Sequence, residues 1–467
     1  MLSGFYKKFL KNKLIGNIVI VICSIILIYI SISLYFTKHF FFNTIVNGVD
    51  LSLKNHNAIN SKFNSFIDEY SLEIIDRSGQ SQIIKGDILE KGKALENEEF
   101  LYNNIKSKQK SFGWLLYLFK ENKYSVDDVY TINEKKLSVI VDDLDIFKEE
   151  IISPENVKFI YNNGKYEMIE EVYGNEANKE KVYETIKMAL LNGKKHINLD
   201  EEGCYESPKY TINSDKAKEI QKELDKYVST NISYLFDEDK EVLSGDRIST
   251  FININNDLDI ELSKEEIKKY IKELSDKYNT IGITRKFKTS TGNTVEVEGG
   301  YYGYKINSVA ETSLLLENIK NGAVIEKEPS YSQKALFRGE NDIGDTYIEI
   351  NISKQYMWFY KEGKIIAQGS VVTGDPRKGN STDTGTYMIN YKQKEAVLRG
   401  ANYEAKVNYW MPFNGNIGIH DANWRYNFGG QIYLNDGTHG CVNATLSLAK
   451  KIYENIDAGT PVICYKE

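Results

Sequence analysis

The sequence has 467 residues, too many for one ordinary hydrophobic core, so two or three domains are expected. Its composition, 41% apolar and 27% charged, is that of a folded and largely soluble chain, neither fibrous nor disordered. Five of the 59 basic residues and none of the 66 acidic residues lie in residues 1–38, so the remainder carries a formal charge of −12 and nucleic acid is not expected as a partner.

The first predicted element is an apolar run at residues 14–36, long enough to cross a bilayer as one helix. The nearby lysines are Lys7, Lys8, Lys11, Lys13 and Lys38. Four of them precede the run, so the positive-inside rule places residues 1–13 in the cytoplasm as a tail and exports the rest. We predict an uncleaved single-pass anchor in the cell membrane, because no small-residue cleavage site follows the long run. A cleaved signal peptide is the alternative.

A helical segment is repeated in the middle of the chain. Two pairs of glycines bracket segments of equal length: Gly174 with Gly193, and Gly303 with Gly322. In each copy an Asn, Asn178 or Asn307, stands where it is expected to cap the helix, and the second glycine fits the left-handed position after the helix. We therefore expect two related α+β modules, at residues 44–200 and 201–335. A capping-box pattern at Ser263 predicts a further helix within the second module.

From residue 343 the sequence becomes rich in predicted strands. The β-rich runs are 347–352, 355–360 and 364–372, and Glu362-Gly363 joins the last two as a hairpin. A helical face follows at residues 446–456 and ends before Gly459, and a final strand comes after Pro461. These patterns predict a mostly-β domain at residues 343–467. The expected fold is therefore multidomain, with one transmembrane helix, two α+β modules and this β domain.

The cysteines direct attention to one position. They are Cys23, Cys204, Cys441 and Cys464, and their spacing fits neither a disulfide framework nor a zinc site. Cys464 lies in an apolar run and is predicted to be a buried strand residue. Cys441 stands shortly before the predicted helix and next to His439-Gly440, so the helix dipole and the imidazole are expected to favour its thiolate. His420, at a predicted strand end, is the expected general base.

A metal site is the alternative for this group of residues. His420, Asp421, His439 and Cys441 are all of types that bind zinc, but they lack paired-ligand spacing. We therefore expect neither a metal nor a cofactor. An isolated Cys beside a His is common in proteins without catalytic meaning, so the pattern alone does not establish an active site.

The segment Thr438-His439-Gly440-Cys441-Val442-Asn443, preceded by His420, resembles the catalytic motif of the L,D-transpeptidases of the YkuD type. Residues 345–467 resemble that catalytic domain over its whole length. The resemblance implies that Cys441 is the nucleophile and His420 its proton acceptor, and that His439 and Asn443 shape the site. It also implies that Gly440 and Cys441 supply backbone donors to an oxyanion.

Other positions are assigned by the same resemblance. Asp421 stands where the family has its third, imidazole-orienting member, and Thr438 and Trp410 lie among the expected substrate-site residues. Trp424 belongs to a long loop, residues 421–437, that is either a lid or a structural loop. The family's Thr-Pro-x-Gly signature stands here as Thr382-Asp383-Thr384-Gly385, with Asp in place of Pro.

The region before the catalytic domain has its own resemblance. Residues 44–52 resemble the opening of the peptidoglycan-binding modules that often precede cell-wall transpeptidases, and residues 299–304 resemble a later signature of that module. The resemblance implies either a wall-binding role or a spacing role for the two modules.

The implied function is that of a cysteine-dependent acyltransferase outside the cell membrane, facing the cell wall. Cys441 would form a thioester with a tetrapeptide stem, release D-alanine, and pass the acyl group to a second stem as a 3-3 cross-link. The expected partners are donor and acceptor peptidoglycan stem peptides, and the resemblance implies acylation by carbapenems. L,D-carboxypeptidase activity, attachment of wall proteins and a non-catalytic wall-binding role are the alternatives. A papain-like peptidase is disfavoured because its Cys precedes its His. The oligomeric state is left open.

Overall fold

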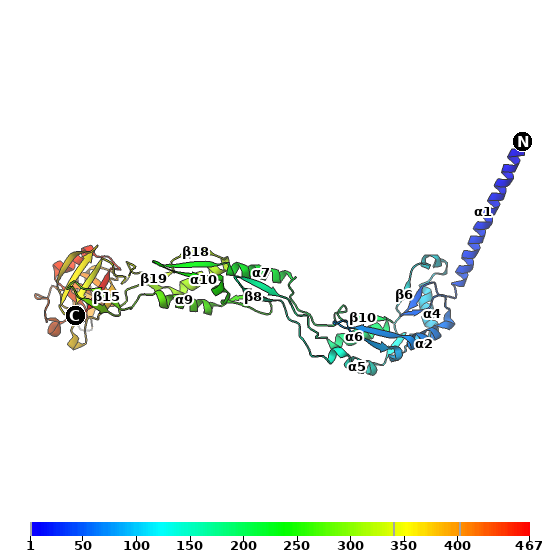
Figure 1. The fold of residues 1–467 in the computed structure, drawn as a ribbon, viewed down its shortest axis with the longest axis horizontal. Helices are drawn as coiled ribbons and strands as arrows, with labels where there is room; N and C mark the ends of the chain where they lie inside the picture. The colour runs from blue at the N-terminus through cyan, green and yellow to red at the C-terminus, as the bar shows by residue number, and fades with distance from the viewer. Residues whose placement is uncertain (1, 340, 401–402) are drawn as a thin grey trace. The chain divides into compact units, whose positions relative to one another are not determined.

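The computed structural model describes residues 2–339, 341–400 and 403–467, and Met1 of the predicted cytoplasmic tail lies outside these residues. The chain divides into two compact units, and their elements can be followed by label and colour in Figure 1. The first unit is Met1–Lys158 with Ile169–Ser214, and the second is Phe159–Met168 with Asp215–Glu467. The fold class expected from the sequence is confirmed, with one apolar helix, mixed α and β modules and a β-rich C-terminal domain.

Helix α1 (Leu2–Tyr35) opens the first unit. Its segment Ile15–Tyr35 is long and apolar enough to cross a membrane. Large apolar side chains between Ile15 and Leu34 are exposed around the whole helix, unlike those of an amphipathic helix on a soluble domain. The predicted apolar helix at residues 14–36 is therefore present as a candidate membrane span.

The rest of the first unit is a mixed module around one hydrophobic core. Its helices are α2 (Ile59–Glu69), α3 (Lys93–Glu96), α4 (Glu98–Ser107), α5 (Glu134–Asp142) and α6 (Lys179–Leu191). Its strands are β1 (Thr44–Val46), β2 (Val49–Asp50), β3 (Ser71–Ile75), β4 (Ser81–Lys85), β5 (Leu89–Lys91), β6 (Asn122–Tyr124), β7 (Tyr130–Ile132) and β10 (His196–Asn198). One sheet has the order β10-β3-β4, in which β10 runs parallel to β3 and β4 antiparallel.

The second unit begins with a module of the same plan. Its helices are α7 (Asp215–Val228), α8 (Gly245–Ser249), α9 (Lys264–Tyr278) and α10 (Ser308–Asn321). Its strands are β8 (Lys158–Asn162), β9 (Lys165–Ile169), β11 (Asn231–Phe236), β12 (Asp239–Leu243), β13 (Ile252–Ile254), β14 (Ile260–Leu262), β15 (Arg285–Lys288), β16 (Thr294–Val297), β17 (Lys305–Ile306), β18 (Val324–Lys327) and β19 (Tyr331–Gln333). The sheet β12-β11-β18 repeats the β4-β3-β10 arrangement, with an antiparallel hairpin and a parallel strand that follows a helix.

The predicted repeat is also confirmed at its helix ends. The Oδ1 atoms of Asn178 and Asn307 accept hydrogen bonds of 3.1 Å from Lys181 and Ala310 backbone N–H groups, so each Asn caps its helix. Gly193 and Gly322 have φ values of 62° and 65°, which glycine adopts without a steric penalty. Local sequence therefore sets the boundaries of both repeated helices.

The C-terminal domain consists of two sheets and a helix around a shared core. The elements of its five-stranded sheet, in the order β22-β21-β20-β28-β23, are β20 (Tyr347–Asn351), β21 (Tyr356–Lys361), β22 (Lys364–Ser370), β23 (Gly385–Met388) and β28 (Pro461–Tyr465). The four-stranded sheet contains β24 (Gln393–Gly400), β25 (Tyr403–Asn414), β26 (Ile417–Asp421) and β27 (Val442–Ala444) in that order. Helices α11 (Tyr433–Asp436) and α12 (Leu446–Asn455) complete the domain. Cys464 is fully buried in β28, as predicted.

The β15–β16 hairpin packs on the C-terminal domain. Phe287 and Val297 of the hairpin share a buried cluster with Ile343, Ile463 and Tyr465, and β15 lies beside the yellow and red strands in Figure 1. The turn of the hairpin reaches the buried carboxylate of Glu349, whose Oε1 accepts from the Ser290 backbone N–H at 2.9 Å. The hairpin thus ties the second module to the sheet that carries β28.

Candidate active site

Three adjacent strands bring the predicted site residues together. Within the four-stranded sheet, His420 of β26 is paired with Trp410 of the antiparallel β25 and with Asn443 of the parallel β27. Asn443 is also bridged to Val372 through two backbone hydrogen bonds, which join β27 to the segment that follows β22. Both His420 and Asn443 are buried, so the surrounding structure restricts their side chains.

The loop before β27 presents Cys441. Gly440 has a φ of 108°, and a Cβ atom there would lie 2.9 Å from Ile417 Cδ1, so the turn requires glycine. The Thr438 hydroxyl donates to the Cys441 carbonyl at 2.6 Å and accepts from the Gly440 N–H at 3.0 Å. The buried Thr382 hydroxyl holds the same loop from outside by donating to the Gly440 carbonyl at 2.7 Å.

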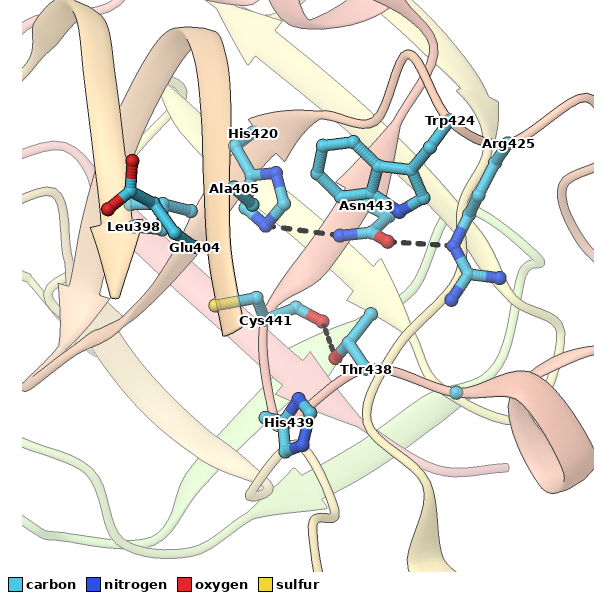
Figure 2. Close-up of a pocket in the computed structure, with 11 residues that line it drawn as sticks. Leu398, Glu404, Ala405, His420, Trp424, Arg425, Thr438, His439, Cys441 and Asn443 are labelled. Carbon is cyan, nitrogen blue, oxygen red and sulfur yellow. Dashed lines mark hydrogen bonds between the residues drawn. The ribbon is translucent and has the colours of Figure 1, made fainter. Parts of the chain in front are cut away.

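The thiol opens into a pocket of about 280 Å³ (Figure 2). The lining residues are Leu398, Glu404, Ala405, His420, Trp424, Arg425, Gly437, Thr438, His439, Cys441 and Asn443. Cys441 is partly exposed, and its Sγ–H donates a weak hydrogen bond to the Asn416 carbonyl at 3.7 Å. The β24–β25 hairpin contributes Leu398, Glu404 and Ala405, so it forms a wall of the pocket.

The hydrogen bonds of His420 define its tautomer. Its Nδ1 lies 2.9 Å from the Asp421 carbonyl oxygen, which can only accept, so Nδ1 carries the proton. Its Nε2 lies 3.1 Å from Asn443 Nδ2 and accepts from that amide. The imidazole therefore has an unprotonated Nε2, the form that a general base needs.

Arg425 fixes the orientation of the Asn443 amide. Its Nε donates to Asn443 Oδ1 at 2.8 Å, which leaves the amide nitrogen directed at His420 (Figure 2). The guanidinium is itself held by Asp436, through the carboxylate at 2.8 Å and the carbonyl at 2.6 Å. Because a guanidinium is a donor only, the amide cannot flip without losing this charge-assisted hydrogen bond.

Burial sets the charge states of the two reactive groups. Desolvation lowers the pKa of His420 below its ordinary value of 6.5, against a smaller opposing effect of Asp421. Desolvation also raises the pKa of Cys441 above 9.0, and the backbone of Gly418 opposes this only weakly. A neutral thiol beside a neutral imidazole is the resting state that these directions indicate.

The direction of this shift does not support the expected thiolate favoured by the helix dipole in the free protein. Cys441 precedes strand β27, and helix α12 begins only at Leu446. The first turn of α12 is capped by Thr445, whose hydroxyl accepts from the Leu448 N–H at 3.3 Å. The dipole acts within about the first turn of a helix, so at this separation burial dominates the thiol's pKa.

The other predicted residues occupy different places around this pair. Asp421 contributes its carbonyl to His420, while its carboxylate accepts from the backbone N–H groups of Asn408 and Tyr409 at 2.8 Å. The Trp410 ring lies 5.7 Å from the His420 ring, and the half-exposed Trp424 ring lies 6.0 Å from it. His439 lines the pocket across the Cys441 backbone from His420 (Figure 2).

Several residues of the site were not predicted as site residues. They are the pocket-lining residues Leu398, Glu404, Ala405 and Gly437, and the hydrogen-bonding residues Arg425 and Thr382. Arg425 was visible only as one residue of a long loop, because its contact with Asn443 spans 18 positions and has no local pattern. Thr382 belongs to the Thr-Asp-Thr-Gly segment, whose match to a family signature was its sequence signal. Its structural role is to join Gly374 and Gly440 through one hydroxyl.

Sequence profiles of two known domain families match the chain. The L,D-transpeptidase catalytic domain (YkuD) matches residues 345–464. The family described as "Putative peptidoglycan binding domain" matches twice, at residues 88–198 and 210–325. No curated protein was found to match the chain.

Solved structures of Enterococcus faecium L,D-transpeptidase are similar to the chain. A cysteine-to-serine mutant of that enzyme is 30% identical over 52% of this chain and 98% of its own, with a TM-score of 0.44. The catalytic domain, solved by NMR, is 38% identical over 26% of this chain and 97% of its own, with a TM-score of 0.25. The same domain acylated by ertapenem gives the same values.

Two kinds of similarity agree on the family. The match covers nearly the whole length of relatives that are at least 30% identical to this chain. The profiles of the catalytic domain and of the N-terminal modules match in the order expected from the sequence. The chain therefore belongs to the L,D-transpeptidases with a YkuD catalytic domain and N-terminal peptidoglycan-binding domains.

Proposed function

We propose that this protein is a membrane-anchored enzyme that forms 3-3 peptidoglycan cross-links through a thioester on Cys441. The observation that carries the proposal is that one pocket holds both the Cys441 thiol and the unprotonated Nε2 of His420. Family membership supports acyl transfer on peptidoglycan. The pocket geometry supports these two residues as nucleophile and base.

In the first half-reaction, His420 Nε2 takes the proton of Cys441 as Sγ attacks the carbonyl that precedes the terminal D-alanine of a tetrapeptide stem. The C–N bond then breaks, His420 returns the proton to the leaving amine, and D-alanine departs. The acyl group remains on Cys441 as a thioester. The lowered pKa of His420 keeps its Nε2 unprotonated near neutral pH, which fits the base role.

In the second half-reaction, the side-chain amine of another stem attacks the thioester. His420 accepts a proton from that amine and returns it to the sulfur, so the product is a new amide and the thiol is regenerated. His439, Thr438, Trp410 and Trp424 would contact or shape the bound stems. Water as the attacking group would give L,D-carboxypeptidase activity, and an amine on a protein would give wall attachment.

The free state needs two local changes before the first step. Asn443 occupies His420 Nε2, so the amide must yield this position when the thiol approaches. The Gly440 N–H donates to the Thr438 hydroxyl. It can donate to an oxyanion, together with the Cys441 N–H, only after this hydrogen bond to Thr438 has broken. Substrate binding in the pocket is the event that we assign to both changes.

The packing of α1 supports an uncleaved anchor. Trp114 of the first module donates from its indole N–H to the Ser33 hydroxyl at 3.2 Å, so the folded module contacts the helix itself. Removal of α1 would expose this face of the module. The lysines that precede the span favour a cytoplasmic N-terminus, so the catalytic domain would lie outside the cell membrane. Residues 44–200 and 201–335 would be modules that bind the wall or space the catalytic domain, 343–467, from it.

The test uses the full chain in detergent with disaccharide-tetrapeptides and follows the products by mass spectrometry. Dimers linked 3-3 and free D-alanine are expected, and both should disappear in Cys441→Ala. Cys23→Ser is the matched control, because it removes a thiol from α1 and leaves the pocket intact. D-alanine without dimers would identify a carboxypeptidase. Products that persist in Cys441→Ala would refute the thioester mechanism.

The ertapenem adduct of the E. faecium catalytic domain supports a second readout. We expect a carbapenem to acylate Cys441 in this chain, and peptide mass spectrometry should locate the adduct there. An adduct on any of the other three cysteines would contradict the assignment of the nucleophile.

A further inference from the structure

A short segment of the first unit exposes an unusual amount of apolar surface. The segment is the 3-10 helix η3 (Ser111–Tyr117) with Leu118 and Phe119, here called the η3 segment. Its exposed side chains and exposed fractions are Phe112 58%, Leu115 58%, Leu116 80% and Phe119 93%. Single exposed apolar residues are ordinary, but four within eight positions form a patch that usually meets a partner or a membrane.

The same segment packs on the last turns of α1. Trp114 is buried, and its ring lies 5.8 Å from Tyr29 and 6.0 Å from Phe36. Its indole N–H donates to Ser33, and the Tyr29 hydroxyl donates to the Phe112 carbonyl. Tyr29 and Ser33 lie on one face of the helix, because residues four apart repeat on the same side, and Phe36 directly follows the helix.

The junction between α1 and the module is tightly held. Lys106 Nζ donates to the carbonyls of Phe36 at 2.6 Å and His39 at 2.9 Å, and the Ser111 hydroxyl donates to Phe36 at 3.1 Å. These donors hold carbonyls of the segment that directly follows the helix. The Phe41 N–H donates to Gln109 Oε1 at 3.0 Å, so the chain after α1 is packed rather than a free linker. The depth of the η3 segment is therefore fixed relative to α1.

The length of α1 gives that depth. Its 21-residue apolar span, Ile15–Tyr35, is about 30 Å long at 1.5 Å per residue, which matches the hydrocarbon core of a bilayer. Tyr29 and Ser33 then lie within the outer half of the membrane or at its boundary. Because Trp114 contacts both residues, the η3 segment is at the same level.

We propose that the η3 segment inserts into the outer leaflet of the membrane that α1 crosses, as a second attachment point beside the helix. This inference rests on the proposed membrane anchor. Phe112, Leu115, Leu116 and Phe119 would enter the acyl boundary, where Trp114 and Tyr29 take the interfacial position common for aromatic residues. Lys108, Lys110 and Lys120, all exposed beside the segment, would face lipid phosphates.

Two attachment points have a mechanical consequence. A single helix lets the attached module rotate about the helix axis and tilt, whereas an inserted segment beside it opposes both motions. The first module would therefore meet the membrane with one defined face. The occupant of the patch is lipid rather than a soluble partner, because the contacts with Tyr29 and Ser33 leave this surface at membrane depth.

The test measures depth with nitroxide labels on the full chain in nanodiscs of phosphatidylcholine and phosphatidylglycerol. Cys23→Ser and Cys441→Ser remove the accessible thiols, while Cys204 and Cys464 are buried. Single labels are placed through Leu116→Cys, through Ile26→Cys in α1, and through Ile83→Cys, an exposed apolar site of the same unit outside the patch. All three positions are exposed, so the labels should not disturb folding.

The expected result is that the Leu116 and Ile26 labels collide mainly with oxygen, and the Ile83 label mainly with a water-soluble nickel chelate. A Leu116 label that responds like the Ile83 label, while Ile26 remains oxygen-rich, would overturn the insertion and leave the anchor intact. Shielding of Leu116 from both reagents would show a protein surface on the patch and would also overturn it. A nickel-accessible Ile26 label would instead refute the anchor and the insertion with it.

Discussion

The amide nitrogen of Asn443 lies 3.1 Å from Nε2 of His420, so the atom that must take the thiol proton already accepts a hydrogen bond in the free protein. The two residues are paired across the parallel strands β26 and β27, which fixes their separation. Arg425 holds the other end of the amide at 2.8 Å. These hydrogen bonds thus define the tautomer of His420, and Cys441 lines the same pocket.

Arg425→Met should lower kcat about tenfold, because loss of one charge-assisted hydrogen bond to a buried amide is a change of roughly 1.4 kcal/mol. KM should change less. The freed amide can flip and present its oxygen to His420, which favours the imidazolium. Loss of the Arg425 charge, which lowers the pKa of His420, also acts to raise that pKa. The acid limb of the kcat/KM profile should therefore move to higher pH. Steady-state rates of D-alanine release across pH measure all three quantities.

Asp436→Asn is the control for this prediction. Its exposed carboxylate holds the far end of the guanidinium, so its loss should change kcat by less than about twofold. If Arg425→Met lowers only the thermal stability and leaves the acid limb in place, Arg425 supports the fold and does not orient the base.

The pH dependence of kcat/KM should show a broad plateau. Activity should rise as pH increases through the lowered pKa of His420, below 6.5, and fall above the raised pKa of Cys441, above 9.0.

The folded protein also binds fewer protons at His420 than the unfolded chain below pH 6.5, so this residue makes stability fall as pH falls. Absorbance at 240 nm should reveal no Cys441-dependent thiolate at pH 7. A thiolate signal that disappears in Cys441→Ala would show an ion pair instead.

Thr382→Val should lower both stability and activity. The substitution keeps the side-chain shape but leaves the Gly374 N–H and the Gly440 carbonyl without their buried partner, at a cost of about 1–3 kcal/mol. The nucleophile loop should lose its position as a result. Thermal unfolding and D-alanine release measure the two effects. Thr382→Ser should restore both, and Thr384→Val, at an exposed neighbour, should change neither; failure of the serine variant to recover would argue against the hydroxyl bridge.

Phe287→Ala should loosen the C-terminal domain although it lies outside the β-rich segment expected from the sequence. Removal of this buried ring costs about 3–5 kcal/mol, and its ring neighbours are Tyr347 and Tyr465. Hydrogen exchange of the β28 amides in the full chain should become faster. Lys286→Ala, an exposed change on the same strand, should have no effect; equal exchange in both variants would mean that the hairpin does not support β28.

Features set by local sequence could be predicted well. The caps at Asn178, Asn307 and Ser263 depend on a side chain and the next turn of the same helix, so the sequence pattern contains the whole interaction. The Glu362-Gly363 hairpin is confirmed for the same reason, since β21 and β22 pair directly across it. The burial of Cys464 followed from its apolar surroundings.

Features that depend on tertiary contacts could not be predicted. Asp421 was expected to orient His420, but a sequence cannot show that its carbonyl makes the contact while its carboxylate turns to β25. The pKa of Cys441 depends on burial, which outweighs a helix that begins five residues later. The exposed η3 segment is recognisable as apolar, but its contact with α1 crosses about 80 positions of sequence.

The most direct measurement of the central claim is the mass of the acyl-enzyme. The full chain is mixed with a disaccharide-tetrapeptide whose side-chain amine is acetylated, so that it can donate but not accept, and the digested protein is examined by mass spectrometry. The Cys441 peptide should gain the mass of the donor minus D-alanine, and the gain should be absent in Cys441→Ala. Release of D-alanine with the adduct on another residue, or with the same yield in Cys441→Ala, would contradict the Cys441 thioester.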